Sequence, residues 1–600
     1  MIKQITTNSL DEQIAKAVCE SLQSVYEITL QANQVQVQKT RKEFAGDRTI
    51  VVFPFVKLAK AKPEDVAHAL GQYVCDNSEL ITNYNVVKGF LNLEINTDYW
   101  LSFFEQASKT PRFGFAEPNT GRTIMVEYSS PNTNKPLHLG HLRNNFLGYS
   151  VAEILKANGH RVSKVQIIND RGIHICKSML AWKKYGEGET PERAGIKGDK
   201  LVGKYYVLFD KKYKEEIAEL VSNGLDEETA AKSAPILKEA QQMLLKWEEK
   251  DKEVYQLWEM MNAWVYEGFE KTYKAMGVDF DKLYYESDTY LYGKEIVLNG
   301  LKNGVFFQKE DGSVWVDLKA EGLDEKLLLR ADGTAVYMTQ DIGTAVLRYQ
   351  DKPDLNQLIY TVGNEQEYHF KVLFLILEKL GYEWASACYH LSYGMVDLPS
   401  GKMKSREGTV VDADDLIADM STTAKAITEE LGKLDGATAE EKQTLYHHLG
   451  NGALKYYLLK VDPLKRMMFN PQESIDFNGN TGPFIQYAHA RICSLLRRGE
   501  ASASYDLGEI TPNAEELNII HAIYDFPAII KEAGASYSPA ILANYLFDLV
   551  KYFNHFYQTH PIFKEQNQHV KQFRLDLASM VGRIINQGMN LLGVTCPERM

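Results

Sequence analysis

The feature that most constrains this chain is a strand, a helix and a second strand that follow one another directly from Thr123. Residues 123–128 form an apolar run of the length of a buried strand, residues 139–157 have a helical pattern closed by Gly159, and residues 162–168 form the next apolar run. Alternation of this kind is typical of a parallel sheet, because each crossover helix carries the chain back to start the neighbouring strand. We therefore predict an α/β domain with a doubly wound, Rossmann-like parallel sheet.

The rest of the chain is organised around that sheet. Residues 1–112 mix helical and strand-like stretches and predict a small α+β module. Residues 113–425 hold the sheet domain, which a helical insertion at about 180–275 interrupts. Residues 426–600 have helical patterns to the end and predict an all-α C-terminal domain. Within the sheet domain, further strand-like segments are expected at 304–318, 358–362 and 390–396, and helices at 335–349 and 367–380.

Composition excludes several classes of protein. The 600 residues are 44% hydrophobic and 24% charged, close to the averages of soluble globular proteins, so neither disorder nor a fibrous chain is expected. The longest apolar run, residues 372–377, is too short to cross a membrane, and the first residues lack the apolar core of a signal peptide. The six cysteines are far apart, which argues against a disulfide scaffold and a structural zinc site. We expect a cytoplasmic protein with reduced thiols, no membrane contact and no metal held by a protein cage.

The distribution of charge bears on nucleic acids. The chain has 67 basic and 80 acidic residues, a net charge of −13, which argues against a protein that coats nucleic acid by bulk charge. Residues 451–600 contain 14 of each sign, which leaves 53 basic against 66 acidic residues in the part before them. The neutral last quarter is therefore better suited to receive a polyanion than the acidic remainder.

A histidine-containing turn lies between the first predicted strand and helix: Ser129-Ser130-Pro131-Asn132-Thr133-Asn134-Lys135-Pro136-Leu137-His138-Leu139-Gly140-His141. Ligands of open α/β sheets bind beyond the carboxyl ends of the strands, and the free amides of a helix start favour phosphate. His138 and His141 would project on one side of the first helical turn, and Gly140 would leave room for a ligand against the backbone. The pattern favours a nucleoside triphosphate site. Two alternatives stay open: a metal-binding histidine pair, which would need a third ligand, and ordinary polar residues at a helix end.

A basic segment follows some 260 residues later, in Gly401-Lys402-Met403-Lys404-Ser405-Arg406-Glu407-Gly408. It places three cations within five positions, between glycines and after a predicted strand. A basic loop of this kind can close on the charge that develops in a phosphoryl transfer. Taken alone, a solvated charged turn is the simpler interpretation, but the two motifs together favour chemistry on a triphosphate.

The His138-Leu139-Gly140-His141 motif resembles the H-I-G-H motif of class I aminoacyl-tRNA synthetases, and residues 402–406 resemble a variant of their K-M-S-K-S loop. The wider context is similar to the arginyl-tRNA synthetase family, because further segments that resemble it occur in the right order. These segments are Gly89-Phe90-Leu91-Asn92, Val126-Glu127-Tyr128-Ser129-Ser130-Pro131-Asn132, Tyr337-Met338-Thr339-Gln340-Asp341-Ile342-Gly343 and Thr481-Gly482-Pro483-Phe484-Ile485-Gln486-Tyr487-Ala488-His489-Ala490-Arg491. The basic loop departs from the family pattern, since Ser405 stands where the second motif lysine is expected, and this leaves open which cation serves the triphosphate.

The resemblance implies ligation of L-arginine to its tRNA in two steps. The arginine carboxylate attacks the α-phosphate of ATP to give arginyl-adenylate and pyrophosphate, and the terminal 2′-hydroxyl of the tRNA then attacks the adenylate. Magnesium is expected with the triphosphate, and the resemblance raises the question whether activation requires bound tRNA. The implied catalytic residues are His138, Gly140, His141, Lys402, Lys404 and Arg406, and the implied ATP-binding residues are His138, Gly140, His141, Met395, Val396, Lys402 and Lys404.

A pocket that prefers arginine should offer carboxylates and an aromatic or hydroxyl neighbour, because a guanidinium is planar, permanently charged and carries five donors. Tyr337 and Asp341 are four residues apart in a helical pattern and would share a face, although an ordinary helix-surface contact is the alternative. The resemblance places both in the arginine pocket with Glu127 as a second carboxylate. It also places Asn132 and Gln366 near the amino-acid head group.

The helical tail is the expected site of tRNA binding. Unstacked bases bind to aromatic faces and guanidinium planes, and one predicted helix carries Tyr487, His489, Arg491, Arg497 and Arg498. The aromatic residues of 545–557 are more typical of a buried helix face. We expect a monomer. Two alternative functions remain: an H-x-G-H nucleotidyltransferase of other specificity that acts without RNA, and a synthetase-like protein that has lost catalysis and binds RNA.

Overall fold

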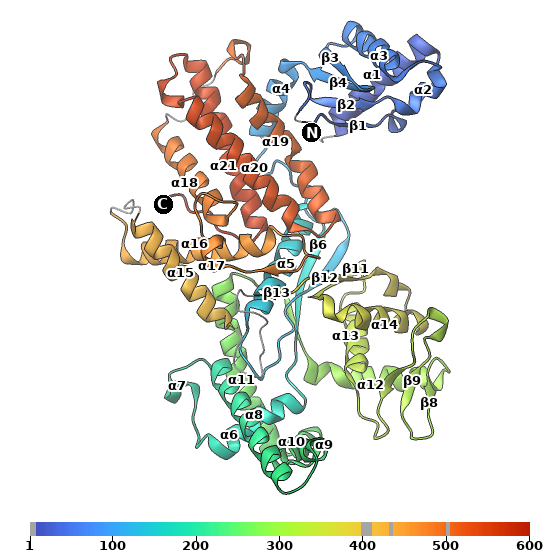
Figure 1. The fold of residues 1–600 in the computed structure, drawn as a ribbon, viewed down its shortest axis with the longest axis vertical. Coiled ribbons are helices and arrows are strands. Elements are labelled where there is room, and N and C mark those ends of the chain that lie inside the picture. The colour runs from blue at the N-terminus through green and yellow to red at the C-terminus, as the bar shows by residue number, and fades with distance from the viewer. Residues whose placement is uncertain (1–7, 42, 398–410, 431–435, 500–504) are drawn as a thin grey trace. The chain divides into compact units, whose positions relative to one another are not determined.

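The structure is a computed structural model that describes residues 8–41, 43–397, 411–430, 436–499 and 505–600 (Figure 1). By internal contacts the chain divides into two compact units. The first consists of Met1–Phe115, Arg491–Glu532 and Tyr545–Ile585. The second consists of Ala116–Ala490, Ala533–Asn544 and Asn586–Met600, and it holds the parallel sheet.

The predicted strand–helix–strand unit is present. It consists of β5 (Thr123–Glu127), α5 (Leu139–Ala157) and β6 (Arg161–Ile168). Gly159 follows the end of α5 with φ +84°, a conformation that glycine adopts without steric cost and that commonly ends helices. Three more strands complete a five-stranded sheet, namely β7 (Lys282–Tyr285), β11 (Gln357–Gly363) and β12 (Cys388–Tyr393).

The sheet has the strand order β12-β11-β5-β6-β7, and every neighbouring pair is parallel. All five residues of the central strand β5 are buried, as expected for a strand in a parallel sheet with both faces covered. The α/β fold class with a parallel sheet is therefore confirmed.

Residues 304–318 form strands, as predicted, but in a sheet of their own. They do not join the parallel sheet but form β8 (Phe307–Gln308) and β9 (Val314–Val316), which pair with β10 (Lys326–Leu329) in an antiparallel sheet of order β10-β9-β8. A tight turn explains this, because Gly312 has φ +88° and the N–H of Lys309 donates to the carbonyl of Ser313 at 2.9 Å. The chain folds back locally, whereas a parallel neighbour would need a long crossover.

The predicted helical insertion lies between β6 and β7. Tryptophans pack its helices, since the rings of Trp182 and Trp264 lie 5.8 Å apart and those of Trp247 and Trp258 lie 5.5 Å apart. Figure 1 shows several of these helices gathered in one body. The helices are α6 (Ile173–Tyr185), α7 (Pro191–Ala194), α8 (Gly198–Ser222), α9 (Glu227–Ser233), α10 (Pro235–Glu248) and α11 (Lys252–Met276).

Helices α12 (Glu286–Lys302), α13 (Tyr337–Asp351) and α14 (Glu367–Lys379) complete the sheet domain. Two glycines bring α12 and α13 together, because a Cβ on Gly293 would lie 1.8 Å from the carbonyl oxygen of Thr339 and a Cβ on Gly343 would lie 2.4 Å from the nitrogen of Gly293. Only glycine permits backbones to approach so closely. This contact fixes the start of α12 beside the start of α13, where two carboxylates of the candidate site lie.

The N-terminal region has an antiparallel sheet of order β1-β2-β4-β3. Its elements are α1 (Asn8–Tyr26), β1 (Val37–Lys39), β2 (Arg48–Val51), α2 (Phe53–Ala59), α3 (Pro63–Asn77), β3 (Ile81–Val87), β4 (Phe90–Ile95) and α4 (Thr97–Ser108). The part after β12 is mostly helical, with α15 (Ala413–Glu430), α16 (Ala439–Leu459), α17 (Pro471–Ser474), α18 (Gly482–Arg498), α19 (Ala514–Ala535), α20 (Pro539–Thr559) and α21 (Gln568–Leu591), and with the short parallel pair β13 (Val396–Asp397) and β14 (Met467–Met468). No helix in the described part of the chain is long and apolar enough to cross a membrane.

Candidate active site

The histidine turn lies at the carboxyl edge of the parallel sheet, between the central strand β5 and helix α5. His138 is the N-cap of α5, and its Nδ1 accepts a hydrogen bond from the backbone N–H of Gly140 at 3.1 Å. The Nδ1 of His141 accepts one from the backbone N–H of His138, also at 3.1 Å, and the two ring centroids are 3.9 Å apart. Each imidazole thus helps to cap the helix through one nitrogen.

These bonds determine what the imidazoles can offer a ligand. Because both Nδ1 atoms accept, we assign the proton of each neutral ring to Nε2, which makes each Nε2 a donor. Burial, together with the charge of Lys135, lowers the pKa of His138 to about 3. Burial, His138 and Lys135 place the pKa of His141 well below its ordinary value. At neutral pH the helix start therefore presents two neutral N–H donors beside a lysine, an arrangement suited to anionic oxygen atoms.

The basic loop residues Lys402, Lys404 and Arg406 lie outside the described residues, as does Ser405. The chain that follows them is bonded to the histidine turn: the N–H of Leu139 donates to the carbonyl of Val411 at 3.2 Å, and that of Ala413 donates to Leu137 at 2.9 Å. His138 and Asp412 form an isolated antiparallel bridge. The described chain therefore resumes directly beside the histidine turn.

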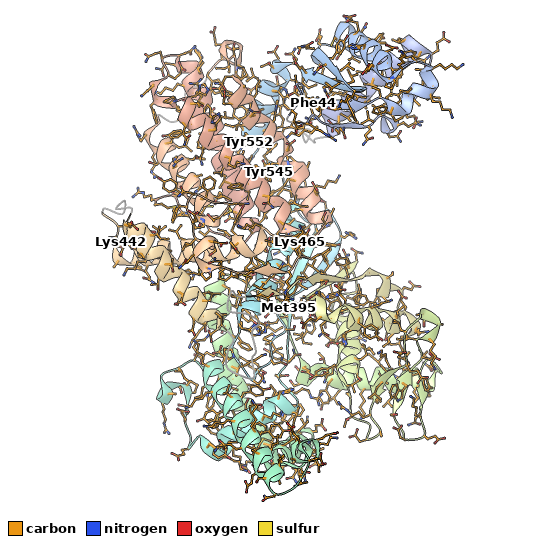
Figure 2. All side chains as sticks on the ribbon, viewed as in Figure 1. Phe44, Met395, Lys442, Lys465, Tyr545 and Tyr552 are labelled. Atoms are coloured by element: carbon orange, nitrogen blue, oxygen red, sulfur yellow. The ribbon has the colours of Figure 1, made fainter. Side chains whose placement is uncertain are left out.

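The chain that precedes the basic loop also contacts α5. The guanidinium of Arg143, which is 1% exposed, donates to the carbonyls of Met395 at 3.5 Å and Lys465 at 2.9 Å; both residues are labelled in Figure 2. Val396, the second predicted ATP contact in this segment, is buried and pairs with Met467 in the parallel pair β13–β14. The chain before the basic loop, at Met395, and the chain after it, at Val411, thus both contact the first turns of α5.

The same edge of the sheet carries the predicted arginine-binding residues. Tyr337 is 72% exposed at the start of α13, and Asp341 follows one turn later with a partly exposed carboxylate that is 2.5 Å from Nε2 of His369. Gln366 is exposed in the short 3-10 helix Asn364–Gln366 that follows β11, the neighbour of β5, and Asn132 is exposed in the turn between β5 and α5. Tyr337 and Asp341 are therefore both accessible to a ligand.

Glu127, the other predicted carboxylate of this pocket, has a partner within the protein. It lies at the end of β5 with 6% exposure and pairs with the guanidinium of Arg348, which is 0% exposed. Burial raises the pKa of the Glu127 carboxyl, while Arg348 opposes that shift. The charge of Asp341 also acts on Glu127, so the two carboxylates are neighbours, but the charge of Glu127 is balanced by Arg348.

A third carboxyl group, Glu286, was missed in the sequence. It is 5% exposed at the start of α12, and burial raises its pKa to about 8, with Arg171 opposing the shift and the charges of Asp170 and Asp341 reinforcing it. Asp170 holds this helix start in place, because its carboxylate accepts hydrogen bonds from the N–H and hydroxyl of Ser287 at 2.9 and 2.7 Å. The signal that could have revealed Glu286 is its position directly after a strand, but the short strand β7 was not recognised. Lys135 was also missed, although it lies within the histidine motif.

The predicted tRNA-binding residues lie along one helix, α18, but their environments differ. Arg497 and Arg498 are exposed, and the guanidinium of Arg498 lies 4.9 Å from the ring of Phe563. Arg491 donates to Oδ1 of Asn554 at 2.8 Å. His489 is buried with Nδ1 3.0 Å from the carbonyl of Pro597, and Tyr487 is half-buried. Among the aromatic residues of 545–557, which lie in α20 (Pro539–Thr559), Phe553 and Phe556 are fully buried. This confirms that these two belong to the core.

Comparison with protein families gives three matches that follow one another along the chain. The family model of the arginyl tRNA synthetase N terminal domain matches residues 11–95. The model of tRNA synthetases class I (R), catalytic domain, matches residues 110–470, and the model of the DALR anticodon binding domain matches residues 485–600.

Curated proteins match over the whole chain. The chain is 56% identical to the arginine–tRNA ligase of Flavobacterium psychrophilum, with 99% of this chain and 100% of the relative covered. It is 55% identical to the arginine–tRNA ligase of Bacteroides thetaiotaomicron, with 98% and 100% covered. Among solved structures, Thermus thermophilus arginyl-tRNA synthetase has the same fold, with a TM-score of 0.77 at 24% identity over 98% of this chain and 100% of that one. These matches do not favour a nucleotidyltransferase of other specificity or an inactive RNA-binding relative.

Proposed function

Because this chain belongs to the arginyl-tRNA synthetase family, and is thus an arginine–tRNA ligase that uses ATP, arginine and tRNA, we propose which of its residues perform each part of the reaction. The observation that carries the proposal is the pair of imidazoles whose Nδ1 atoms are bonded to the start of α5, beside the chain on both sides of the basic loop, at Met395 and at Val411. The triphosphate of ATP would lie at this helix start. Gly140 makes room for the His138 ring, since a Cβ there would lie 3.0 Å from Cε1 of His138, and Met395 and Val396 would line the nucleotide site.

In the first step the arginine carboxylate attacks the α-phosphate, and the bond from that phosphorus to the bridging oxygen of the leaving pyrophosphate breaks. The carboxylate is already a nucleophile, so the protein needs to position the reactants and stabilise negative charge. The Nε2–H groups of His138 and His141 would donate to phosphate oxygens. Lys135, Lys402, Lys404 and Arg406 would add positive charge, and magnesium would enter as part of the substrate MgATP, held by the phosphate oxygens.

The arginine side chain would be recognised at the start of α13. Asp341 is the accessible carboxylate, and its two oxygens can accept parallel bonds from a guanidinium, while the exposed ring of Tyr337 can cover the guanidinium plane. Glu127, whose charge is balanced by Arg348, would support the pocket from behind through this buried pair. Glu286 would add a further carboxyl group, and Asn132 and Gln366 would hold the amino-acid head group.

In the second step the terminal 2′-hydroxyl of the tRNA attacks the carbonyl carbon of arginyl-adenylate and AMP leaves. The tRNA would contact Arg497, Arg498 and Arg491, with Tyr487 and the buried His489 shaping the same helix. We propose that residues 1–112 and residues 426–600, which precede and follow the catalytic domain at 113–425 in the sequence, both bind tRNA. The protein would act as a monomer in the cytoplasm and would not bind DNA.

The proposal is tested by arginine-dependent exchange of pyrophosphate into ATP, measured with and without tRNA. We expect Asp341→Asn to raise KM for arginine at least about 100-fold, because charge-assisted bidentate bonds contribute about 3 kcal/mol. Asp351→Asn on the same helix is the matched control, since this carboxylate pairs with Lys282 at 2.5 Å outside the pocket and should leave KM unchanged. Equal KM values for the two variants would refute the role of Asp341.

A further inference from the structure

A polar cavity lies within the unit that holds the parallel sheet, away from the histidine turn. It has a volume of about 450 Å³ and lies between α5, α11, α16 and the last residues of the chain. Its lining on α5 begins at Tyr149, eight residues after His141, which is about 12 Å along the helix axis. The cavity is therefore separate from the proposed ATP site. The side chains that matter for its chemistry are Tyr149, Lys274, His447, His448, Asn451 and Lys455.

Lys455 is the unusual member of this lining. Its side chain is 3% exposed, and its Nζ donates to the backbone carbonyl of Gly593. Within the part of the chain that the structure describes, no carboxylate forms an ion pair with it. A buried ammonium group without a counter-ion is costly, and this cost lowers the pKa of Lys455 to about 7. Natural proteins usually pair such a group.

The neighbouring groups also favour an anion. Lys274 adds a basic side chain, and His447 and His448 add imidazoles whose pKa burial lowers, so that they line the cavity as neutral rings at neutral pH. The one acidic residue of the described lining, Glu153, is already engaged, because its carboxylate is 2.9 Å from Nζ of Lys156 and 3.2 Å from that of Lys164.

An unpartnered acceptor lies in the same wall. Asn451 is 8% exposed, and its Nδ2 donates to the carbonyl of Ala275 at 2.6 Å, while its Oδ1 has no hydrogen-bond partner among the described residues. This oxygen is itself fully buried, so it belongs to the wall of the cavity and not to its accessible surface. A ligand with anionic oxygens would supply the counter-ion that Lys455 lacks among the described residues.

We propose that this cavity is a binding site for a phosphate group, with Lys455 as its buried counter-ion. The volume is within the range of small-ligand sites and admits a phosphate or a small phosphorylated compound. Both inorganic phosphate and a phosphate ester supply anionic oxygens that can pair with the ammonium group of Lys455. The phosphate can come from a free compound or from the backbone of bound tRNA, and only the second source rests on the proposed function.

The test compares the wild-type chain with Lys455→Met, which keeps the volume of the side chain and removes the charge. Inorganic phosphate should raise the melting temperature of the wild type and have at least a tenfold weaker midpoint in the variant. Crystals soaked in selenate should show an anomalous peak within hydrogen-bond distance of Nζ of Lys455 that phosphate displaces. This pair of results identifies a free phosphate compound.

Binding of tRNA distinguishes the second source. If a backbone phosphate occupies the cavity, the slope of log Kd against log salt concentration should fall by about one in Lys455→Met, with no response to free phosphate. If Lys455→Met fails to fold, the same measurements are made on Lys274→Gln and His448→Asn, which also change the lining of the cavity. The proposal is overturned if the variants keep both the wild-type rise in melting temperature with phosphate and the wild-type slope of log Kd for tRNA against log salt concentration. A selenate peak without a rise in melting temperature in solution counts as an adventitious ion only.

Discussion

The buried pair between Glu127 and Arg348 predicts a large and asymmetric loss of stability when either partner is replaced. The guanidinium of Arg348 is fully buried, 5.0 Å from the ring centroid of Tyr284 and 5.6 Å from that of Tyr360. In Arg348→Met the Glu127 carboxyl can take up a proton. Its ordinary pKa is 4.5, so at pH 7 this costs at most about 3.4 kcal/mol, at about 1.36 kcal/mol per pH unit. In Glu127→Gln the guanidinium cannot release its proton, and the unpaired buried charge costs up to about 5 kcal/mol.

Unfolding in urea, followed by pulse proteolysis at pH 7 and pH 5.5, measures both losses. The loss in Arg348→Met should shrink by up to about 2 kcal/mol at the lower pH, because protonating a carboxyl becomes easier as the pH approaches 4.5. The loss in Glu127→Gln should not shrink. The double variant should be within about 2 kcal/mol of the wild type, since replacing a whole buried pair by neutral groups is often tolerated. Single losses below about 1 kcal/mol, or a double variant as unstable as the summed single ones, would refute the reasoning.

Three further predictions concern the candidate site. His138→Asn keeps an acceptor for the N–H of Gly140 but removes the Nε2–H donor, so the melting temperature should hold while kcat/KM for ATP in pyrophosphate exchange falls about 100- to 1,000-fold; a loss below tenfold would contradict this. Glu286 binds its proton more tightly when folded, with a pKa of about 8 against an ordinary 4.5, so stability should fall as pH rises between these values, by at most about 1.4 kcal/mol per pH unit. Urea unfolding at several pH values measures this dependence, and Glu286→Gln should lose the part of it that Glu286 causes. A free energy of unfolding that depends on pH as in the wild type would argue against the burial of this carboxyl. Lys200 contacts Asp415 at 2.7 Å and Asp412 at 3.5 Å, so Lys200→Met should loosen the chain beside the histidine turn and raise KM for ATP by up to about fivefold; an equal rise in KM for arginine would show a general disturbance instead.

Much of the sheet domain could be predicted because its signals are local. The bounds of α5 agree with the predicted helix at both ends, since the histidine turn caps its start and Gly159 ends it. The apolar run of β5 is the pattern of a strand buried on both faces. The strand–helix–strand order then places His138 and His141 at the carboxyl edge of a parallel sheet before any coordinates are known.

Contacts between distant segments could not be read in the same way. Residues 304–318 had the composition of a strand, but a tight turn directed them to a separate antiparallel sheet. The strand β7, four residues long and rich in tyrosine, belongs to the parallel sheet only because it lies beside β6. Glu286 was overlooked for the same reason, because its role depends on that strand and on the close packing of α12 against α13.

The sequence by itself determined the chemical identity of this protein: the spacing of histidines, glycines and cations within short motifs, and the order of those motifs, already indicated a class I synthetase for arginine. Only the tertiary structure decided how the charges are shared. It pairs Glu127 with Arg348, leaves Asp341 accessible, and buries Lys455 beside a polar cavity. The physical reason is that the charge state and accessibility of a side chain depend on its burial and on neighbours distant in sequence, which motif spacing does not contain.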